Sequence, residues 1–283
     1  MTLEGLTLYP IATNIIAMDQ KLNHQPRLTM RVAKGSLIFT MPDGSSATQI
    51  AYDRYVPKSG MSLPANLREA YKTEKLLQRP TKKAQVLVDS NALLIPIEEY
   101  HEDDNDTLYY HCFPETEGCV VVSNVLAQLN AVALFAVNRD LKLVVDDHYP
   151  DVRYTLLMRP VWDYLRIRSM VGNRRKLYAY YHDSVLELFS IERNRFIFSN
   201  RYETRHAKDL TYFILFVWKQ LALDQQRDEL FLVGDLPDKD ELLATLRKYV
   251  QVVCVINPSA SFNRAPLTQI KGIPFDLITY YLG

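Results

Sequence analysis

The second half of the chain begins with three short runs rich in apolar and aromatic residues. They span Lys176–Tyr181, Val185–Ile191 and Arg195–Tyr202, and short polar stretches separate them. This pattern predicts a meander of three antiparallel strands. Apolar residues then recur every three or four positions from 206 to 223, which predicts a helix. Further apolar runs and helical stripes alternate towards the last residues, so the predicted order is β-β-β-α-β-α-β-α.

The predicted helix at 206–223 is apolar on nearly every face. Its apolar residues are Leu210, Tyr212, Phe213, Ile214, Leu215, Phe216, Val217, Trp218 and Leu221. A helix that is apolar all round lies in a core rather than on a surface. We therefore expect this helix to be deeply buried, with Phe213 and Trp218 in the core and Thr204 as its N-cap.

The first half repeats the opening of this plan. Its predicted strands are Leu28–Ala33, Leu37–Met41, Gln49–Tyr55 and Gln85–Val88. A helix capped by Ser62 is predicted between the third and fourth strands. Corresponding elements of the two halves are offset by a nearly constant interval of roughly 145 to 149 residues, which indicates duplication of one domain.

Beyond the fourth strand the first half departs from the plan. Runs at Leu108–Cys112 and Cys119–Ser123 predict a hairpin, in which Cys112 and Cys119 face each other. The acidic run between them and the fourth strand is expected to be an exposed mobile loop. We place the first, divergent domain at 1–157 and the second at 158–283, with a linking helix near 159–171 at its start.

The stretch from Cys119 to Val137 carries no charged residue and is about as long as a membrane span. Four polar residues interrupt it and no cluster of Lys or Arg flanks it, which disfavours a span. We interpret it as buried strands with a turn at Ser123 and Asn124. The first residues show neither the basic nor the apolar region of a secretory leader, so none is expected, and three cysteines are too few for a disulfide framework. A cytoplasmic location is therefore expected.

The predicted order of elements is that of the ribonuclease-H-like fold, and two such units in tandem resemble the actin-like ATPases. The segments FSNRYETRHAKDLTYFILFVWKQLAL and DELFLVGDLPDKDELLATLRKYV, together with Leu93-Leu94-Ile95-Pro96, go further. They are similar to an uncharacterised bacterial family of unknown function that is thought to have this duplicated fold. The resemblance covers most of the second half and patches of the first. It implies an α/β fold with mixed sheets and helices on their faces, and it implies no activity.

The actin-like resemblance implies an ATP cleft, with an acidic residue and glycines on the first hairpin of each domain. The hairpin at 181–184 holds no glycine and the hairpin at 33–36 holds no acid, and the whole chain has 9 glycines. We therefore expect no ATP turnover and predict no cofactor. The candidates for holding a ligand in the interdomain cleft are Asp183, Ser184, Gly234 and Asp235.

Other catalytic and metal sites are also disfavoured. A two-metal nuclease of this fold needs carboxylates on its first and fourth strands. The first strands carry none, so Asp89 and Asp235, which follow the fourth strands, lack a partner. The metal-ligating types His101, His111, Cys112 and Cys119 do not have the close spacing of a zinc site. The sequence therefore predicts neither a catalytic residue nor a metal ligand.

The charge balance disfavours a dedicated nucleic-acid binder, because 33 basic residues match 33 acidic ones. The densest basic cluster lies near the domain junction and consists of Arg166, Arg168, Arg174, Arg175 and Lys176. A solvated surface is its favoured interpretation, and a phosphate backbone is the alternative.

Three functions remain open. The favoured hypothesis is a non-enzymatic cytoplasmic scaffold that binds a protein partner and has a degenerate cleft. The first alternative is a nucleotide or small molecule in the interdomain cleft. The second is RNA binding through the basic cluster near the domain junction.

Overall fold

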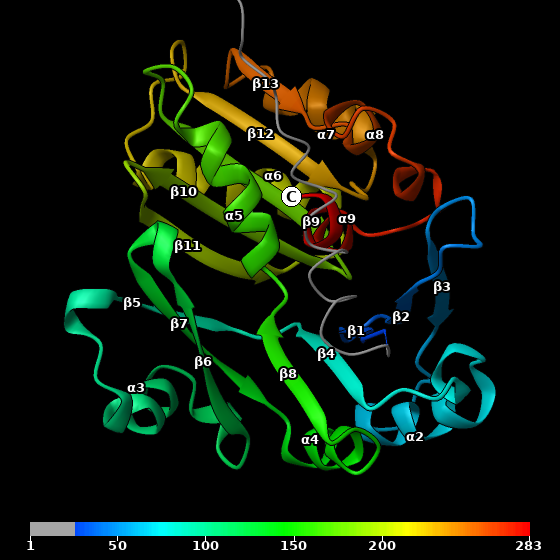
Figure 1. The fold of residues 1–283 in the computed structure, drawn as a ribbon. Helices are drawn as coiled ribbons and strands as arrows, with labels where there is room; N and C mark the ends of the chain where they lie inside the picture. Colours follow the sequence, from blue (N-terminus) through cyan, green and yellow to red (C-terminus); the bar gives the residue numbers. More distant parts are fainter. Residues whose placement is uncertain (1–25) are drawn as a thin grey trace, which may run out of the picture.

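The structure is a computed structural model that describes residues 26–283. These residues form two five-stranded mixed sheets and a three-stranded antiparallel sheet (Figure 1). The prediction that the chain starts without a leader concerns residues outside the described range. Within 26–283, no helix combines the length and the apolar character that crossing a membrane requires.

Sheet A belongs to the first half of the chain and has the strand order β3-β2-β1-β4-β8. Its strands are β1 (Leu28–Val32), β2 (Leu37–Pro42), β3 (Ile50–Tyr55), β4 (Lys83–Val88) and β8 (Asp151–Leu156). The first three form the antiparallel meander, and β1, β4 and β8 are parallel. The strand β8 was not predicted, because only its last residue is fully buried and no clear apolar run marks it.

Sheet C belongs to the second half and repeats this order as β11-β10-β9-β12-β13. Its strands are β9 (Lys176–His182), β10 (Val185–Glu192), β11 (Arg195–Glu203), β12 (Glu229–Gly234) and β13 (Val252–Val255). The meander is again antiparallel, and β9, β12 and β13 are again parallel. The same order and directions in both halves confirm the predicted duplication of a ribonuclease-H-like unit.

Residues 92–137 form an insert in the first half that has no counterpart in the second. It contains sheet B, with the order β5-β7-β6, and the helix α3. Their bounds are β5 (Ala92–Pro96), α3 (Asn105–Cys112), β6 (Val120–Leu126) and β7 (Ala131–Val137). In Figure 1 the insert lies at the lower left, beside sheet A.

The predicted hairpin of Leu108–Cys112 with Cys119–Ser123 is wrong. The first run is the end of α3, where Tyr109 is buried and donates a hydrogen bond from its hydroxyl to the Asn91 carbonyl. Periodicity cannot distinguish a helix from a strand in a run this short. Cys112 and Cys119 are therefore not cross-strand neighbours, and both are free thiols. The acidic run before α3 forms short 3-10 turns and the start of α3 instead of the predicted loop.

The turn predicted at Ser123 and Asn124 is also wrong, since both residues lie inside β6. The Asn124 amide accepts a hydrogen bond from the Leu156 backbone N–H and donates one to the Tyr154 carbonyl. Asn124 thus ties β6 to β8, and its polar side chain serves the packing of two sheets. The chain turns at 127–130 instead, where Asn130 adopts a left-handed conformation.

One face of each large sheet is covered by helices of its own half. The helices are α2 (Leu63–Thr73) and α4 (Arg139–Asp146) on sheet A, and α6 (Ala207–Gln220) and α7 (Lys239–Leu246) on sheet C. Ser62 caps α2, as predicted. The predicted cap Thr204 is wrong for α6, which begins with a capping box between His206 and Asp209.

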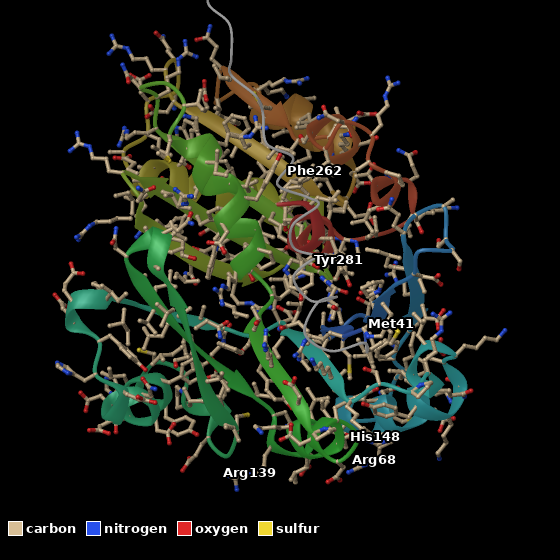
Figure 2. The ribbon with its side chains drawn as sticks, in the orientation of Figure 1. Met41, Arg68, Arg139, His148, Phe262 and Tyr281 are labelled. Atoms are coloured by element: carbon tan, nitrogen blue, oxygen red, sulfur yellow. The ribbon has the colours of Figure 1, made fainter. Side chains whose placement is uncertain are left out.

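The last helix of each half packs on the sheet of the other half. The helix α5 (Arg159–Ser169) follows sheet A in the chain, but the ring of its Trp162 packs edge-on against Phe196 of sheet C, with centroids 5.0 Å apart. The helix α9 (Phe275–Leu282) follows sheet C, but its Leu277 packs against sheet A. The two helices also contact each other. Figure 2 shows Tyr281 of α9 at the boundary between the two halves.

The remaining short elements lie in the connections. They are α8 (Pro258–Ser261) and the 3-10 turns Leu76–Gln78, Ile97–Glu99, Glu102–Asp104, Pro114–Thr116, Ala127–Leu129 and Pro266–Gln269.

The helix α6 is buried on one side only, so the prediction of a fully buried helix is wrong. Trp218 and Ile214 lie in the core, as expected for that side. Tyr212 and Phe216 are 62% and 50% exposed, and Phe213 is half-buried. A single layer of sheet lies against α6, and its opposite side faces the surface. Periodicity located the helix but could not show how many layers surround it.

Candidate functional site

The first hairpins of the two domains meet at the domain boundary. The first hairpin joins β1 to β2 through the turn at 33–36, and the second joins β9 to β10 through Asp183 and Ser184. Asp183 and Ser184 have positive φ angles, 45° and 63°. Such angles are typical of two-residue hairpin turns, whose backbone twist matches that of the flanking strands. A Cβ atom added to Gly35 would lie 2.9 Å from Oδ1 of Asp183, so the two turns are in contact.

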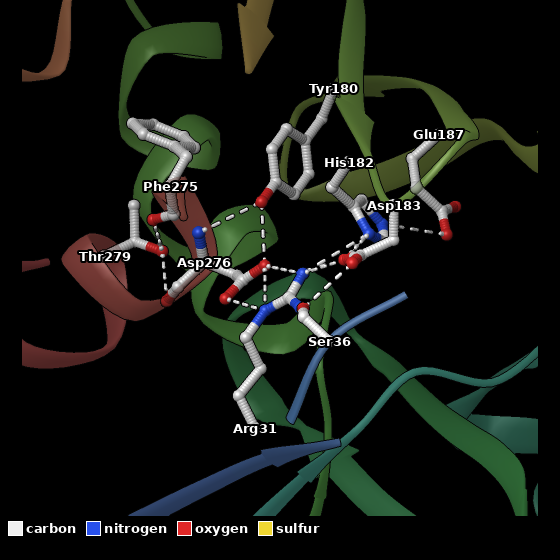
Figure 3. Close-up of polar contacts among 9 residues, drawn as sticks. All are labelled: Arg31, Ser36, Tyr180, His182, Asp183, Glu187, Phe275, Asp276 and Thr279. Carbon is white, nitrogen blue, oxygen red and sulfur yellow. Dashed lines mark hydrogen bonds and ion pairs between the residues drawn. The ribbon is translucent and has the colours of Figure 1, made fainter. Parts of the chain in front are cut away.

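A fully buried arginine holds the two hairpins together (Figure 3). Nη2 of Arg31, on β1, lies 2.7 Å from Oδ2 of Asp183. Nη1 of Arg31 donates to Oγ of Ser36 at 3.0 Å, and that hydroxyl donates to Oδ1 of Asp183 at 2.9 Å. The pair therefore links the first strand of one domain to the first turn of the other.

The helix α9 supplies a second buried carboxylate to the same arginine. Nε and Nη2 of Arg31 donate to the two oxygens of Asp276 at 2.8 and 2.9 Å. Tyr180, on β9, donates its hydroxyl to Oδ2 of Asp276 at 2.7 Å. Both Arg31 and Asp276 are 0% exposed. A buried charge is tolerated only when it is paired and hydrogen-bonded, and this fork-like pairing meets that requirement.

The ionisation of Asp183 follows from its neighbours. Burial alone would raise the pKa of Asp183, but the hydrogen bond from His182 and the charge of Arg31 outweigh burial. They hold the pKa of the carboxyl well below its ordinary value, so Asp183 is ionised at neutral pH. The two hairpins are thus joined by a charge pair.

His182 connects this ion pair to a second group of charges. Burial alone would lower its pKa, but interactions with Asp183, Glu187 and Asp89 raise the pKa to about 9. Its Nδ1 lies 3.3 Å from Asp183, and its Nε2 lies 3.9 Å from Oε1 of Glu187. Arg201, on β11, contacts both Asp89 and Glu187, at 3.0 and 3.6 Å.

An open cleft of about 740 Å³ lies beside the joined hairpins. We call it the insert cleft, because it runs between the insert and sheet A. It is lined by the carboxyl ends of β1 and β4, the start of α2, the insert at 115–119, and two residues of β11, Arg201 and Glu203. In open α/β sheets, ligands bind outside the carboxyl ends of the parallel strands. The insert cleft has that position in the first domain.

None of the four residues predicted to hold a ligand lines the insert cleft as the structure describes it, and Asp183 contacts the first domain. Asp183 is engaged by Arg31 and Ser36, and Ser184 is exposed at the turn. Gly234 ends β12 with φ 105°, where a Cβ atom would lie 1.9 Å from the Tyr181 carbonyl oxygen. Asp235 follows it on the surface. Gly234 is thus required by the close approach of two strands.

The predicted basic cluster is largely engaged within the chain. Arg175 pairs with Asp228 at 2.9 Å, and Arg174 pairs with Glu229 at 3.5 Å. Lys176 is buried and donates to the Val171 and Arg174 carbonyls. These contacts reduce the positive charge that faces solvent near the domain junction.

Arg31 and Asp276 were not recognised from the sequence. Each is a single charged residue in an otherwise apolar element, LTMRV for β1 and FDLITYYL for α9. A buried charge needs a buried partner, so this pattern was the available signal. The two residues are 245 positions apart, and only the fold brings them together.

Solved structures share the architecture. A protein of unknown function with the actin-like ATPase fold from Bacteroides thetaiotaomicron superposes with a TM-score of 0.78 at 26% identity, covering 91% of this chain and 95% of that one. A PilM-PilN type IV pilus biogenesis complex superposes with a TM-score of 0.57 at 11% identity, covering 90% and 97%. No curated protein matches the sequence. The predicted actin-like fold is confirmed.

The family comparison agrees with the resemblance seen in the sequence. The model of a family described as "Protein of unknown function (DUF3822)" matches residues 17–253, which is most of the chain. The predicted membership in an uncharacterised family with this fold is confirmed. The chain therefore belongs to the DUF3822 family of proteins of unknown function.

Proposed function

We propose that this chain is a non-hydrolysing member of the actin-like fold that binds a segment of a partner protein in the insert cleft. The observation that carries the proposal is that Arg31 ties the two first hairpins together while a cleft of about 740 Å³ stays open beside them. The three free cysteines fit a reducing compartment, and we place the protein in the cytoplasm.

The contact of the hairpins argues against a nucleotide between the domains. Phosphate binding at such turns needs free backbone N–H groups and space for the anion. Here Asp183 is engaged by Arg31 and Ser36 and contacts the turn at Gly35, so the two turns leave little space between them. A phosphate would have to separate the two turns and displace this buried ion pair. The cleft candidate Asp183 accordingly serves the joint between the domains.

The lining of the insert cleft suits a peptide segment. Its three basic and three acidic residues balance in number, and four of them form two pairs, Lys34 with Glu203 at 3.3 Å and Arg201 with Asp89 at 3.0 Å. The rest of the lining mixes polar side chains such as Asn91 with apolar ones such as Met61, which is 40% exposed. A cleft with balanced charge and accessible apolar surface favours side chains and backbone over a phosphorylated small molecule.

The fold neighbour adds support for a protein partner. The PilM-PilN structure is by its title a complex of type IV pilus biogenesis. At 11% identity it shares the fold alone with this chain, so it supports partner binding as a use of the fold and does not name the partner.

The test uses the native cysteines as reporters. Cys119 lines the insert cleft, and Cys112 is exposed outside its lining, so the second thiol is an internal control. Thiol labelling is followed after mixing the protein with native lysate from its source. A partner segment in the cleft slows labelling of Cys119 and leaves Cys112 unchanged, and Met61→Arg abolishes the protection.

Fractionation of the lysate separates the alternatives. Protection by the macromolecular fraction that survives nuclease treatment supports the proposal. Protection by the dialysable fraction supports a small-molecule ligand, and nuclease-sensitive protection supports RNA; either result contradicts a protein partner. Equal labelling of Cys119 with and without every fraction also contradicts it.

A further inference from the structure

Three potential metal ligands converge where the insert cleft meets the second domain. They are Asp89 after β4, His182 at the end of β9 and Glu187 on β10. One donor atom from each lies within 4.8 Å of the other two. The side chains are nearly buried, with exposures of 5%, 4% and 7%. Such a group differs from the acidic clusters of protein surfaces because it is enclosed and contains an imidazole.

Among the residues that the structure describes, the buried Nε2 of the His182 imidazole has no hydrogen-bond partner. Nδ1 is held by Asp183 at 3.3 Å, so the ring is oriented with Nε2 towards Glu187. Metal-binding histidines are held in this way, with one nitrogen on a carboxylate and the other on the ion.

The local charge also favours a cation. Six charged side chains are linked to His182 directly or through one another. They are Arg31, Arg201, Asp89, Asp183, Glu187 and Asp276. Two guanidinium groups thus face four carboxylates, and a proton on the imidazole offsets only half of the two excess negative charges. A divalent ion balances this excess and takes the place of the proton on Nε2.

We propose that Asp89, His182 and Glu187 form a site for a first-row divalent metal ion that joins the two domains. One imidazole and two carboxylates suit ions such as Mn²⁺ and Zn²⁺, whereas Mg²⁺ prefers oxygen donors and several waters. Arg201 orients the carboxylates through Asp89 Oδ1 and Glu187 Oε1. Asp89 also lines the insert cleft, which gives the ion a path from solvent. The site does not depend on the proposed partner.

The test is a titration of the metal-stripped full chain with Mn²⁺, in which paramagnetic resonance measures the free ion. Mn²⁺ is chosen because it disfavours the thiolates of the free cysteines. We expect one saturable ion per chain, with affinity weakened about 10- to 100-fold or more in Asp89→Asn and Glu187→Gln. Glu115→Gln is the matched control, because Glu115 also lines the insert cleft but lies outside the site.

Two results of the titration overturn the proposal. One is the absence of saturable binding, which would leave Arg201 as the counter-cation of the carboxylates. The other is an equal loss of affinity in Glu115→Gln. If the variants do not fold, magnetic resonance of the unmodified protein decides: Mn²⁺ should broaden the His182 ring signals before those of His101 and His111. Broadening of His101 or His111 first contradicts the site.

Discussion

Nη2 of Arg31 and Oδ2 of Asp183 lie 2.7 Å apart and join the first hairpins of two duplicated domains. Their side chains are 0% and 8% exposed, so little solvent screens the pair. The contact lies where the resemblance to actin-like ATPases implies that phosphate would bind. In this chain the ion pair at that position joins the two domains, and the function that we propose uses the insert cleft beside it.

Removal of the Arg31 guanidinium should strongly destabilise the protein. Arg31→Met leaves Asp183 and Asp276 buried without their cation. Breaking a buried ion pair on one side costs about 3–5 kcal/mol. Urea unfolding should therefore show that loss, and the additional change Asp276→Asn should restore part of it because it removes one uncompensated charge.

The matched control for Arg31→Met is Lys34→Met, only three residues further along the same hairpin. Lys34 pairs with Glu203 across the same domain boundary, but both side chains are more than three-quarters exposed. Exposed pairs contribute about 0–1 kcal/mol. A loss in Lys34→Met equal to that in Arg31→Met would contradict the special role of the buried pair.

Replacement of Gly234 should disturb the end of β12. A Cβ atom there would lie 1.9 Å from the Tyr181 carbonyl oxygen, and the φ angle is 105°. Gly172→Ala is the control, because Gly172 has φ 77° with open space around its Cβ position. The left-handed backbone alone costs an alanine about 1–2 kcal/mol. Thermal melts should show a clearly larger loss for Gly234→Ala, and equal losses would contradict the close contact with Tyr181.

The order of most elements along the two halves could be predicted because its signals are local. Alternating and continuous apolar runs marked the meanders, and the long stripe marked α6. The pattern failed where burial is partial, as at Asp151–Leu156, and where a run was too short, as at Leu108–Cys112. It also failed at Asn124, because a polar residue inside a strand looks like a turn until its partner strand is known.

The joint between the hairpins was not predicted. Turn chemistry, which is local, marked Asp183 only as a candidate for holding a ligand. The partner of Asp183 could not be predicted, because Arg31 lies in a different domain and Asp276 lies on the last helix. Such contacts depend on the exchange of α5 and α9 between the sheets, and no periodicity encodes that exchange.

The two sides of α6 should respond differently to truncation. Ile214 is fully buried, and Ile→Ala in a core costs about 2–5 kcal/mol. Phe216 is 50% exposed, and surface substitutions usually change stability by about 0.5 kcal/mol or less. Phe213→Ala should fall between them, because its half-buried ring stacks on Tyr202 at 4.3 Å. A thermal melt in which Phe216→Ala loses as much as Ile214→Ala would contradict the exposed side.

The most direct test of the closed phosphate position is a thermal melt of the unmodified protein with and without Mg²⁺ and ATP. A ligand at 100 times its Kd stabilises the native state by about 2.7 kcal/mol, which moves the melting temperature of a protein this size by several degrees. We expect an unchanged midpoint at millimolar ATP and no release of phosphate above background. A rise of several degrees, accompanied by phosphate release that Asp183→Asn abolishes, would contradict the account.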